Sequence, residues 1–400
     1  MTDAEAALPA ESIRRDAVLL IASSFAVATS NSVIFAALSD LQDTYGFGEA
    51  GLGLVAGMGF VAGLLGNLFL APLADRGHAK RLIMAGMVLG AAGSAMLALG
   101  DSLLDFVVAR AVIGLSFGLV FPSVRALLAN LDPARRGILL GRLAGIELLG
   151  FVVGPLIGGL MIDPFGLPTT FLAFSLVNLA ALAAVAPRSF PQLNSTGQSA
   201  RPSLELLALP RLQVAVLVFM AMQAPVGIFD AMWDRYLTDL GAGNSMVGIS
   251  FALYTAPFIL LSSYGGRLAD RREPQSIALW SMLLVIPAVA SYGAFRSLSP
   301  VIAANVAEGV FQALAYPAAV AAVAAAAPAG RAGAAQGLAG AAGLMMSAII
   351  AFTAPIVYGW AGSADGWGGI AAFGGLGIVM AAIVGAAAVR WRTVRDLPVS

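Results

Sequence analysis

Apolar stretches of about 20 residues recur along the whole chain and are separated by short polar loops. A stretch of this length crosses a ~30 Å hydrocarbon core as an α-helix. Alternating strand patterns of about ten residues are absent, which excludes a β-barrel. The pattern therefore predicts an all-α membrane protein with twelve spanning helices, at residues 17–38, 48–71, 81–100, 104–126, 137–160, 168–187, 213–237, 245–267, 276–296, 300–325, 332–358 and 366–390.

The composition agrees with a membrane protein, since 59% of residues are hydrophobic, 11% are charged and the mean hydropathy is +0.88. The N-terminal residues 1–16 are polar and the first apolar stretch is long, so we expect it to remain as a helix and not to be a cleaved signal peptide. Cysteine is absent, which excludes disulfides, thiol catalysis and iron–sulfur clusters. The single histidine, His78, leaves no metal site to assemble, and the zero net charge argues against a nucleic-acid partner.

The basic residues predict the orientation of the chain. Of the 22 Lys and Arg residues, Arg110 lies within a predicted helix, Arg235 and Arg296 fall on one side, and the other nineteen fall on the opposite side. Because Lys and Arg gather in cytoplasmic loops, we expect both termini in the cytoplasm. Arginine outnumbers lysine 21 to 1, as in a GC-rich bacterium, so the predicted location is a bacterial inner (plasma) membrane.

The second half of the chain repeats the first at an offset of 195 residues, without gaps from about residue 43 to 145. Gly53 falls on Gly248, Pro122 on Pro317, and the phrase Leu-Ala-Asp-Arg occurs in both copies. Such an internal repeat predicts two structurally equivalent units. We expect a first six-helix bundle at 1–187, a polar linker at 188–212 and a second six-helix bundle at 213–400.

Three motifs accompany the repeat. The loop "APLADRGHAKR" and its copy "GGRLADRR" contribute Asp75, Arg76, Asp270 and Arg271. The fourth helix contains "VVARAVIGLSFG", with Arg110 and Gly114. The fifth helix contains "GRLAGIELLGFVVGPLIGG", which places glycine and proline at Gly141, Gly150, Gly154, Pro155, Gly158 and Gly159.

Together these features resemble the major facilitator superfamily over essentially the entire chain. The loop motif departs from the family pattern where Ala71 and His78 replace glycines. In the fourth-helix motif, Ile113 stands where Gln is usual. The complete fifth-helix motif resembles that of drug–proton antiporters; the alternative is a packing face without a role in the direction of transport. The resemblance implies two pseudo-symmetric bundles around a central cavity, and an inner gate at the four charged residues of the two loop copies.

Four ionisable residues lie inside predicted helices, where charge is costly: Arg110, Glu147, Asp230 and Glu308. None has an ionisable counterpart in the repeat, so we expect a functional role for each in proton coupling. The alternative for the acids is a buried ion pair that ties two helices together. Arg110 and Glu308 lie about 9 Å and about 12 Å from the outer ends of equivalent helices, which predicts that they face each other across the cavity. Asp234 and Arg235 are expected to be solvated at the outer mouth.

The remaining candidates for the cavity are aromatic and uncharged polar residues: Asn31, Phe35, Phe121, Phe151, Gln223, Trp233, Tyr254, Asn305, Phe311 and Tyr316. Aromatic side chains suit an apolar or cationic compound. The alternative is that most of them face lipid or neighbouring helices, and that the polar ones tie helices together.

The sequence thus predicts a proton-coupled exporter of small amphipathic or drug-like compounds, working as a monomer by alternating access. Its energy source would be the proton gradient, with no cofactor. Two alternatives remain: an exporter or proton symporter of a native metabolite such as a sugar, amino acid or siderophore, and a sensor or assembly partner without transport. An enzyme is not expected, because neither a nucleotide-binding loop nor a catalytic cluster is present.

Overall fold

The computed structural model describes residues 10–70, 73–132, 135–190, 204–328, 331–363 and 366–395, apart from the side chains of Ala10 and Asp75. These residues form helices and hold no strand, which confirms the predicted all-α class. The first half contains α1 (Ala10–Ser32), α2 (Leu38–Tyr45), α3 (Glu49–Leu65), α4 (Ala79–Leu99), α5 (Leu103–Leu131) and α6 (Arg136–Val185). The second half contains α7 (Pro210–Asp239), α8 (Asn244–Arg271), α9 (Pro274–Ser291), α10 (Leu298–Ala325), α11 (Ala332–Trp360) and α12 (Gly375–Val394).

Short helical turns adjoin these helices. Turns of 3-10 helix cover Val33–Ala36, Leu204–Ala208 and Tyr292–Ala294, and turns of π-helix cover Gly66–Leu70, Ala74–His78 and Ile370–Gly374. Residues 191–203 of the predicted linker lie outside the described residues.

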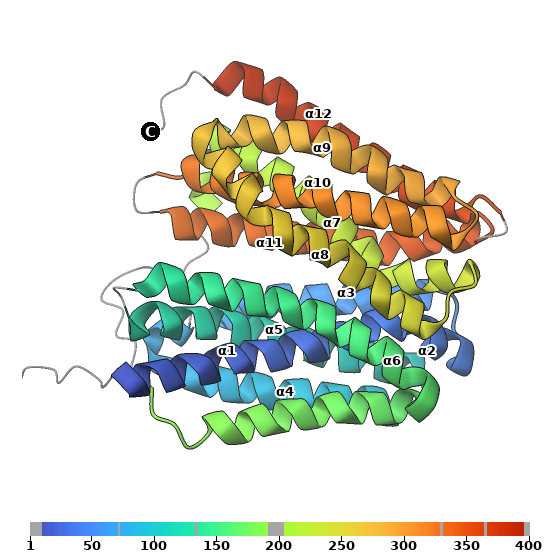
Figure 1. The fold of residues 1–400 in the computed structure, drawn as a ribbon, viewed down its shortest axis with the longest axis horizontal. Coiled ribbons are helices and arrows are strands. Elements are labelled where there is room, and N and C mark those ends of the chain that lie inside the picture. The colour runs from blue at the N-terminus through green and yellow to red at the C-terminus, as the bar shows by residue number, and fades with distance from the viewer. Residues whose placement is uncertain are drawn as a thin grey trace, which may run out of the picture.

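Helix α6 accounts for two of the twelve predicted spans, so eleven described helices are long and apolar enough to cross a membrane. A straight helix of its 50 residues would be about 75 Å long, more than twice the thickness of the hydrocarbon core. The chain reverses at Gly166, whose φ of +78° suits glycine, between Pro164 and Pro168. Figure 1 shows the second part of α6 returning beside α4.

The first predicted span, 17–38, differs at both ends from the helix in the structure. Helix α1 begins at Ala10 and ends at Ser32, and after a 3-10 turn the residue Ala37 leaves helical geometry with a φ of −135°. The short helix α2 then starts in a new direction at the end of the molecule. This break brings polar residues of α2 into contact with α7.

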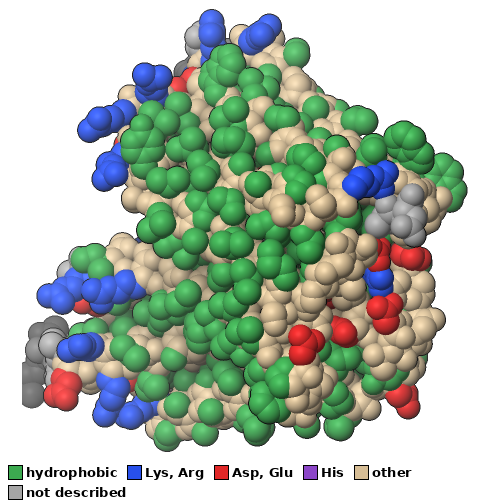
Figure 2. Space-filling view, turned by 45° about the vertical axis from the view of Figure 1, so that its right-hand side comes forward, with side chains coloured by type: hydrophobic (Ala, Val, Ile, Leu, Met, Phe, Trp, Pro, Cys, Tyr) green, Lys and Arg blue, Asp and Glu red, His purple; other side chains and the backbone are tan. Residues whose placement is uncertain are grey.

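The helices form two bundles, α1–α6 and α7–α12, which lie side by side along their length (Figure 1). The bundles meet where α3 packs on α11 and α6 on α8, and they diverge toward the end where α1 begins and α12 ends. Figure 2 shows the surface hollowed between the bundles at this end, where Lys and Arg side chains gather, whereas Asp and Glu gather at the opposite end. We call the basic end inner and the acidic end outer, following the predicted orientation.

At the outer end the backbones of the two bundles touch at Gly53 and Gly248, which are equivalent positions of the repeat. A Cβ atom at Gly53 of α3 would lie 2.9 Å from the carbonyl oxygen of Phe352 in α11. A Cβ atom at Gly248 of α8 would lie 2.5 Å from the carbonyl oxygen of Pro155 in α6. Only glycine permits such an approach, so the outer end is closed by two pseudo-symmetric contacts.

Candidate functional site

A buried ion pair joins the two bundles. Nη2 of Arg110, on α5, donates to Oδ2 of Asp230, on α7, at 2.5 Å. The side chains are 2% and 1% exposed. Removing one partner of such a pair leaves an uncompensated charge in a medium of low dielectric. The pair therefore favours the arrangement in which the bundles are together at this depth.

Neighbouring residues fix the position of the guanidinium. Nη1 of Arg110 donates to the carbonyl oxygen and the Oδ1 atom of Asn31, at 2.9 and 2.8 Å. The ring of Phe35 lies 5.6 Å from the guanidinium carbon, within the range of a cation–π contact. Gly114 allows α5 to approach α3 closely, and Gly59 of α3 lies against the guanidinium. Oδ1 of Asp230 makes no hydrogen bond with the described residues, so this oxygen is available to a proton.

Gly59→Ala is expected to displace the guanidinium, because the added Cβ would lie 2.7 Å from Nε and 2.9 Å from Cζ of Arg110. Overpacking of this kind costs about 1–3 kcal/mol. The measurement is the free energy of unfolding in detergent. Gly385→Ala on α12 is the matched control, because its added Cβ would have no atom within 4 Å. Equal effects of the two substitutions would contradict the placement of Arg110.

A second ion pair lies nearer the inner end, within the first bundle. Nη2 of Arg125, on α5, donates to Oε2 of Glu147, on α6, at 2.6 Å. The Arg125 side chain is 54% exposed and that of Glu147 is 6% exposed. The guanidinium carbon of Arg125 lies 5.6 Å from the ring of Phe121, which contacts the ring of Phe151 edge-on. This pair is thus open to the inner side, unlike the pair of Arg110 and Asp230.

Glu308 on α10 is buried within the second bundle. Its Oε2 atom accepts a hydrogen bond of 2.5 Å from the hydroxyl of Tyr292. Its Oε1 atom has no hydrogen-bond partner among the described residues. Asn305, one turn away, is also buried, and its Oδ1 atom likewise has no such partner. Glu308 therefore sits in a polar pocket of one bundle and does not bridge the two.

Three geometric predictions are wrong for this conformation. Arg110 and Glu308 were expected to face each other, but Arg110 is bound to Asp230, and Glu308 is bound to Tyr292. Asp234 was expected to be solvated, but it is 1% exposed, because the break before α2 lays Ser39 over it. Arg235 was expected to be solvated as well, but it is half-buried between two carboxylates.

The predicted cavity residues occupy different environments. Trp233 is fully buried and donates to the hydroxyl of Ser250 at 2.9 Å, so it does not line an open cavity. Phe35 and Phe121 are buried as well. Tyr316 is 40% exposed, and its ring contacts that of Phe258 edge-on and that of Phe219 at a tilt. Asn31 and Asn305 are buried too, and the other members of the set are half-buried: Phe151, Gln223, Tyr254 and Phe311.

The glycine motif of α6 forms a packing face. Gly150 and Gly154 lie against α1, where a Cβ at Gly154 would lie 2.1 Å from Oγ of Ser32, and Gly158 lies against Val33 of the 3-10 turn that follows α1. Gly159 lies against α8, where its Cβ would be 2.2 Å from the carbonyl oxygen of Asn244. Gly141 has no atom within 4 Å of such a Cβ. The motif thus connects α1, within its own bundle, to the contact between the bundles.

The predicted inner-gate residues lie at the inner ends of the helices. Arg76, Asp270 and Arg271 are exposed there, and the side chain of Asp75 lies outside the described part of the chain. Because the bundles diverge at this end, the expected contacts across the inner gate stay a prediction for the closed state.

Asp40 on α2 lies half-buried at the outer contact between the bundles. Burial raises the pKa of Asp40 above its ordinary value of 3.8, and the Asp163 and Asp43 carboxylates raise it further. A hydrogen bond with Asn244 and the charge of Arg235 oppose the rise in the pKa of Asp40. The carboxyl group therefore binds a proton more tightly here than in water.

Protonation of Asp40 is expected to contribute a preference for closure of the outer end, because opening would return this carboxyl group to water. The preference is complete below a pH of 3.8 and is lost as the pH rises through the raised pKa of Asp40. The measurement is the distance between spin labels on Thr169→Cys and Ser297→Cys, at the outer ends of the two bundles, between about pH 4 and pH 7. Asp40→Asn should reduce the pH dependence, and an unchanged profile would contradict the assignment.

Comparisons with known proteins place these features in a family context. The Major Facilitator Superfamily model matches residues 20–236, and the model of the MFS_1 like family matches residues 178–367. Multidrug resistance protein MdtG of Serratia proteamaculans (strain 568) is 29% identical over 249 residues, which cover 59% of this chain and 60% of that protein. MdtG of Escherichia coli O9:H4 (strain HS) is 27% identical over 257 residues, covering 59% and 61%. The match spans about three fifths of the length of these relatives.

Solved structures show the same fold. A bacterial homolog to the human lysosomal transporter Spinster, inward-facing and unoccupied, has a TM-score of 0.81 at 15% identity and covers 96% of this chain and 98% of its own. A D-xylose-proton symporter has a TM-score of 0.74 at 15% identity and covers 97% and 99%. These likenesses extend over both bundles.

Proposed function

The chain belongs to the Major Facilitator Superfamily of membrane transporters, and from this premise we propose that it is a proton-coupled antiporter that exports small amphipathic or drug-like compounds. The observation that carries the proposal is the buried ion pair between Arg110 and Asp230. This pair joins the two bundles, which must separate during alternating access. The energy source in this proposal is the proton gradient, without a cofactor.

The ion pair links protonation to the movement of the bundles. Opening of the outer end draws α5 away from α7 and leaves the Asp230 carboxylate without its cation, so that it takes up a proton from outside. Closure returns Arg110 to the carboxylate, and the proton leaves toward the inner cavity. The compound binds from the inner cavity while the Asp230 carboxylate is ionised and paired with Arg110, so binding of the compound draws protons off the protonated form. Proton and cargo thus exclude each other, which is the condition for antiport.

Glu147 is the second proposed coupling residue, because its pair with Arg125 is open to the inner side. The neighbouring rings of Phe117, Phe121 and Phe151 offer an apolar wall to an amphipathic compound. The relatedness to multidrug resistance proteins and the complete glycine motif of α6 support export. Glu308 is proposed as a third proton site, within the second bundle.

The alternative is a transporter, either exporter or proton symporter, of a native metabolite. The exposed guanidinium of Arg125 favours it, because a polar cargo needs such a donor in the inner cavity. The likeness to a sugar–proton symporter is compatible with this alternative and shows the fold alone.

The test uses purified protein and inside-out vesicles. A thermal-shift screen of drugs and metabolites at two pH values selects a compound that binds. Antiport predicts that this compound accumulates in acid-loaded vesicles and partly collapses their pH gradient. Accumulation without an effect on the pH gradient would contradict proton coupling, and movement of the compound out of the vesicles together with protons would favour the symporter.

A further inference from the structure

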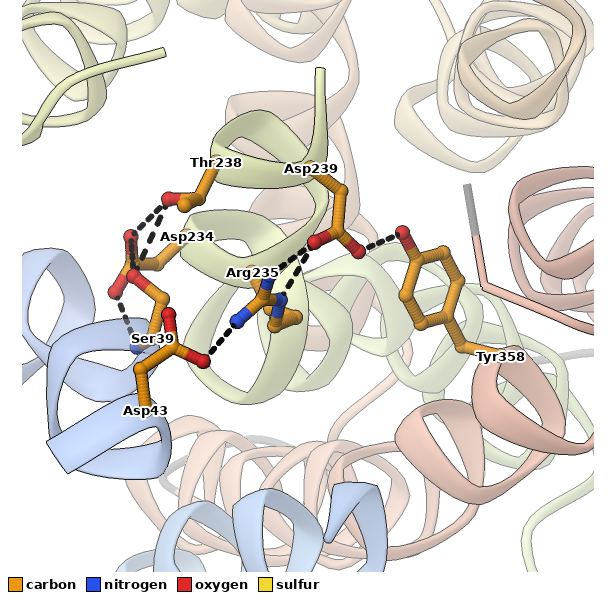
Figure 3. A network of polar contacts seen from close by, with 7 residues as sticks. All are labelled: Ser39, Asp43, Asp234, Arg235, Thr238, Asp239 and Tyr358. Atoms are coloured by element: carbon orange, nitrogen blue, oxygen red, sulfur yellow. Dashed lines mark hydrogen bonds and ion pairs between the residues drawn. The ribbon is translucent and has the colours of Figure 1, made fainter. Parts of the chain in front are cut away.

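The outer end holds a buried polar contact between the bundles that is separate from the pair of Arg110 and Asp230 (Figure 3). The backbone nitrogen and the hydroxyl of Ser39, on α2, donate to the two carboxylate oxygens of Asp234, on α7, each at 2.8 Å. The hydroxyl of Ser39 also lies 3.2 Å from that of Thr238. Ser39 and Asp234 are each 1% exposed, so the carboxylate depends on these donors in place of water.

The two residues occupy equivalent positions when the offset of the internal repeat is extended four residues back from residue 43, where the gap-free alignment begins. Ser39 and Asp234 are separated by 195 residues, which is the offset of the repeat. A residue that touches its own equivalent lies on the axis that relates the two units. Opening of the outer end moves the two bundles away from this axis, so it has to break the contact.

An outer row of charges surrounds the contact and involves α2, α7 and α11. Nη1 of Arg235 donates to Asp43 of α2 at 2.7 Å, and the same guanidinium is paired with Asp239. The hydroxyl of Tyr358, on α11, donates to the other oxygen of Asp239 at 2.6 Å. Because Asp43 is 61% exposed, its ion pair contributes little by itself. The buried contact of Ser39 with Asp234 therefore dominates, and the row orients α2 on α7.

We infer that Ser39 and Asp234 form an outer latch, which holds the transporter closed to the outside and sets how often it opens there. The latch follows from the family fold and these contacts, independently of proton coupling. Loss of its charge-assisted hydrogen bonds raises the population that is open to the outside.

The experiment takes advantage of the absence of cysteine from the chain. One pair of spin labels, on Thr169→Cys and Ser297→Cys, reports the outer end, and a second pair, on Asn130→Cys and Ala325→Cys, reports the inner end. Asp234→Asn is expected to raise the ratio of outward-open to outward-closed molecules by roughly tenfold. The outer distance then lengthens and the inner distance shortens. Ser39→Ala, which retains the backbone donor, should act in the same direction with a smaller shift.

Asp105→Asn is the matched control, since it removes the same charge from a carboxylate at the outer end that bonds to Ser102 and Asp101 of its own bundle. The double variant with Ser39→Ala and Asp234→Asn should shift the ratio by less than the product of the single shifts, because the two substitutions remove one contact. If Asp234→Asn does not fold, the distances measured in Ser39→Ala test the latch. Distances in the latch variants equal to those of Asp105→Asn, or fully multiplicative shifts, would overturn the latch.

Discussion

Arg110→Met is expected to destabilise the protein by about 3–5 kcal/mol, because it leaves the Asp230 carboxylate buried without its cation. Asp230 is 1% exposed, so water cannot replace the lost partner without a change in packing. The free energy of unfolding, measured by titration with a denaturing detergent, reports the loss. The effect should exceed that of Arg125→Met, because Arg125 is 54% exposed.

The double variant with Arg110→Met and Asp230→Asn separates the charge from the packing. It removes both charges, so the protein should recover most of the stability lost in Arg110→Met. A double variant that is as unstable as Arg110→Met would mean that the guanidinium acts through its bonds to Asn31 and its packing on Gly59 and Phe35, and not through the ion pair.

Asp230→Asn is expected to lower transport driven by the proton gradient by at least roughly a hundredfold, because an amide cannot take up and release the proton. Exchange of labelled for unlabelled compound without a gradient should survive, since it needs movement of the bundles but no net proton transfer. The measurement is uptake of the selected compound into inside-out vesicles, with and without a gradient.

Glu308→Gln and Asp105→Asn complete the comparison. Glu308 has its hydrogen bond within one bundle, so Glu308→Gln should reduce gradient-driven uptake less than Asp230→Asn. Asp105→Asn should leave uptake unchanged, because its carboxylate caps the start of α5. Gradient-driven uptake that persists in the double variant of Asp230→Asn with Glu308→Gln would refute the assignment of both acids.

Hydropathy and the repeat were sufficient to predict the fold. Each predicted span lies within or overlaps a helix, because a span needs only length and apolar character, which are local properties of the sequence. The reversal inside α6 appears in the sequence as Pro164 and Gly166, which were assigned to a loop, and Pro168, where the next predicted span begins. The break after α1 was missed, because the polar residues 29–32 were included in a single span at 17–38 and Ala37 has no sequence signal for its φ of −135°.

The sequence identified the charged residues of the site, but it did not predict which of them form ion pairs with each other. Costly charges within helices identified Arg110, Glu147, Asp230 and Glu308, but which acid meets Arg110 depends on how the bundles are rotated, which no local pattern encodes. Arg125 was missed as the partner of Glu147 because its place near the inner end suggested a solvated arginine. Its spacing of fifteen residues from Arg110, about four helical turns, could have identified it. Ser39 could have been found from its equivalence to Asp234 in the repeat.

The most direct test of the central claim is the release of protons when cargo binds. The compound selected by thermal shift is added to purified protein in weakly buffered detergent solution that contains a pH indicator. The account predicts that the wild-type protein releases protons on binding, and that Asp230→Asn binds the compound and releases fewer. Binding to the wild-type protein without proton release, or equal release from Asp230→Asn, would contradict it.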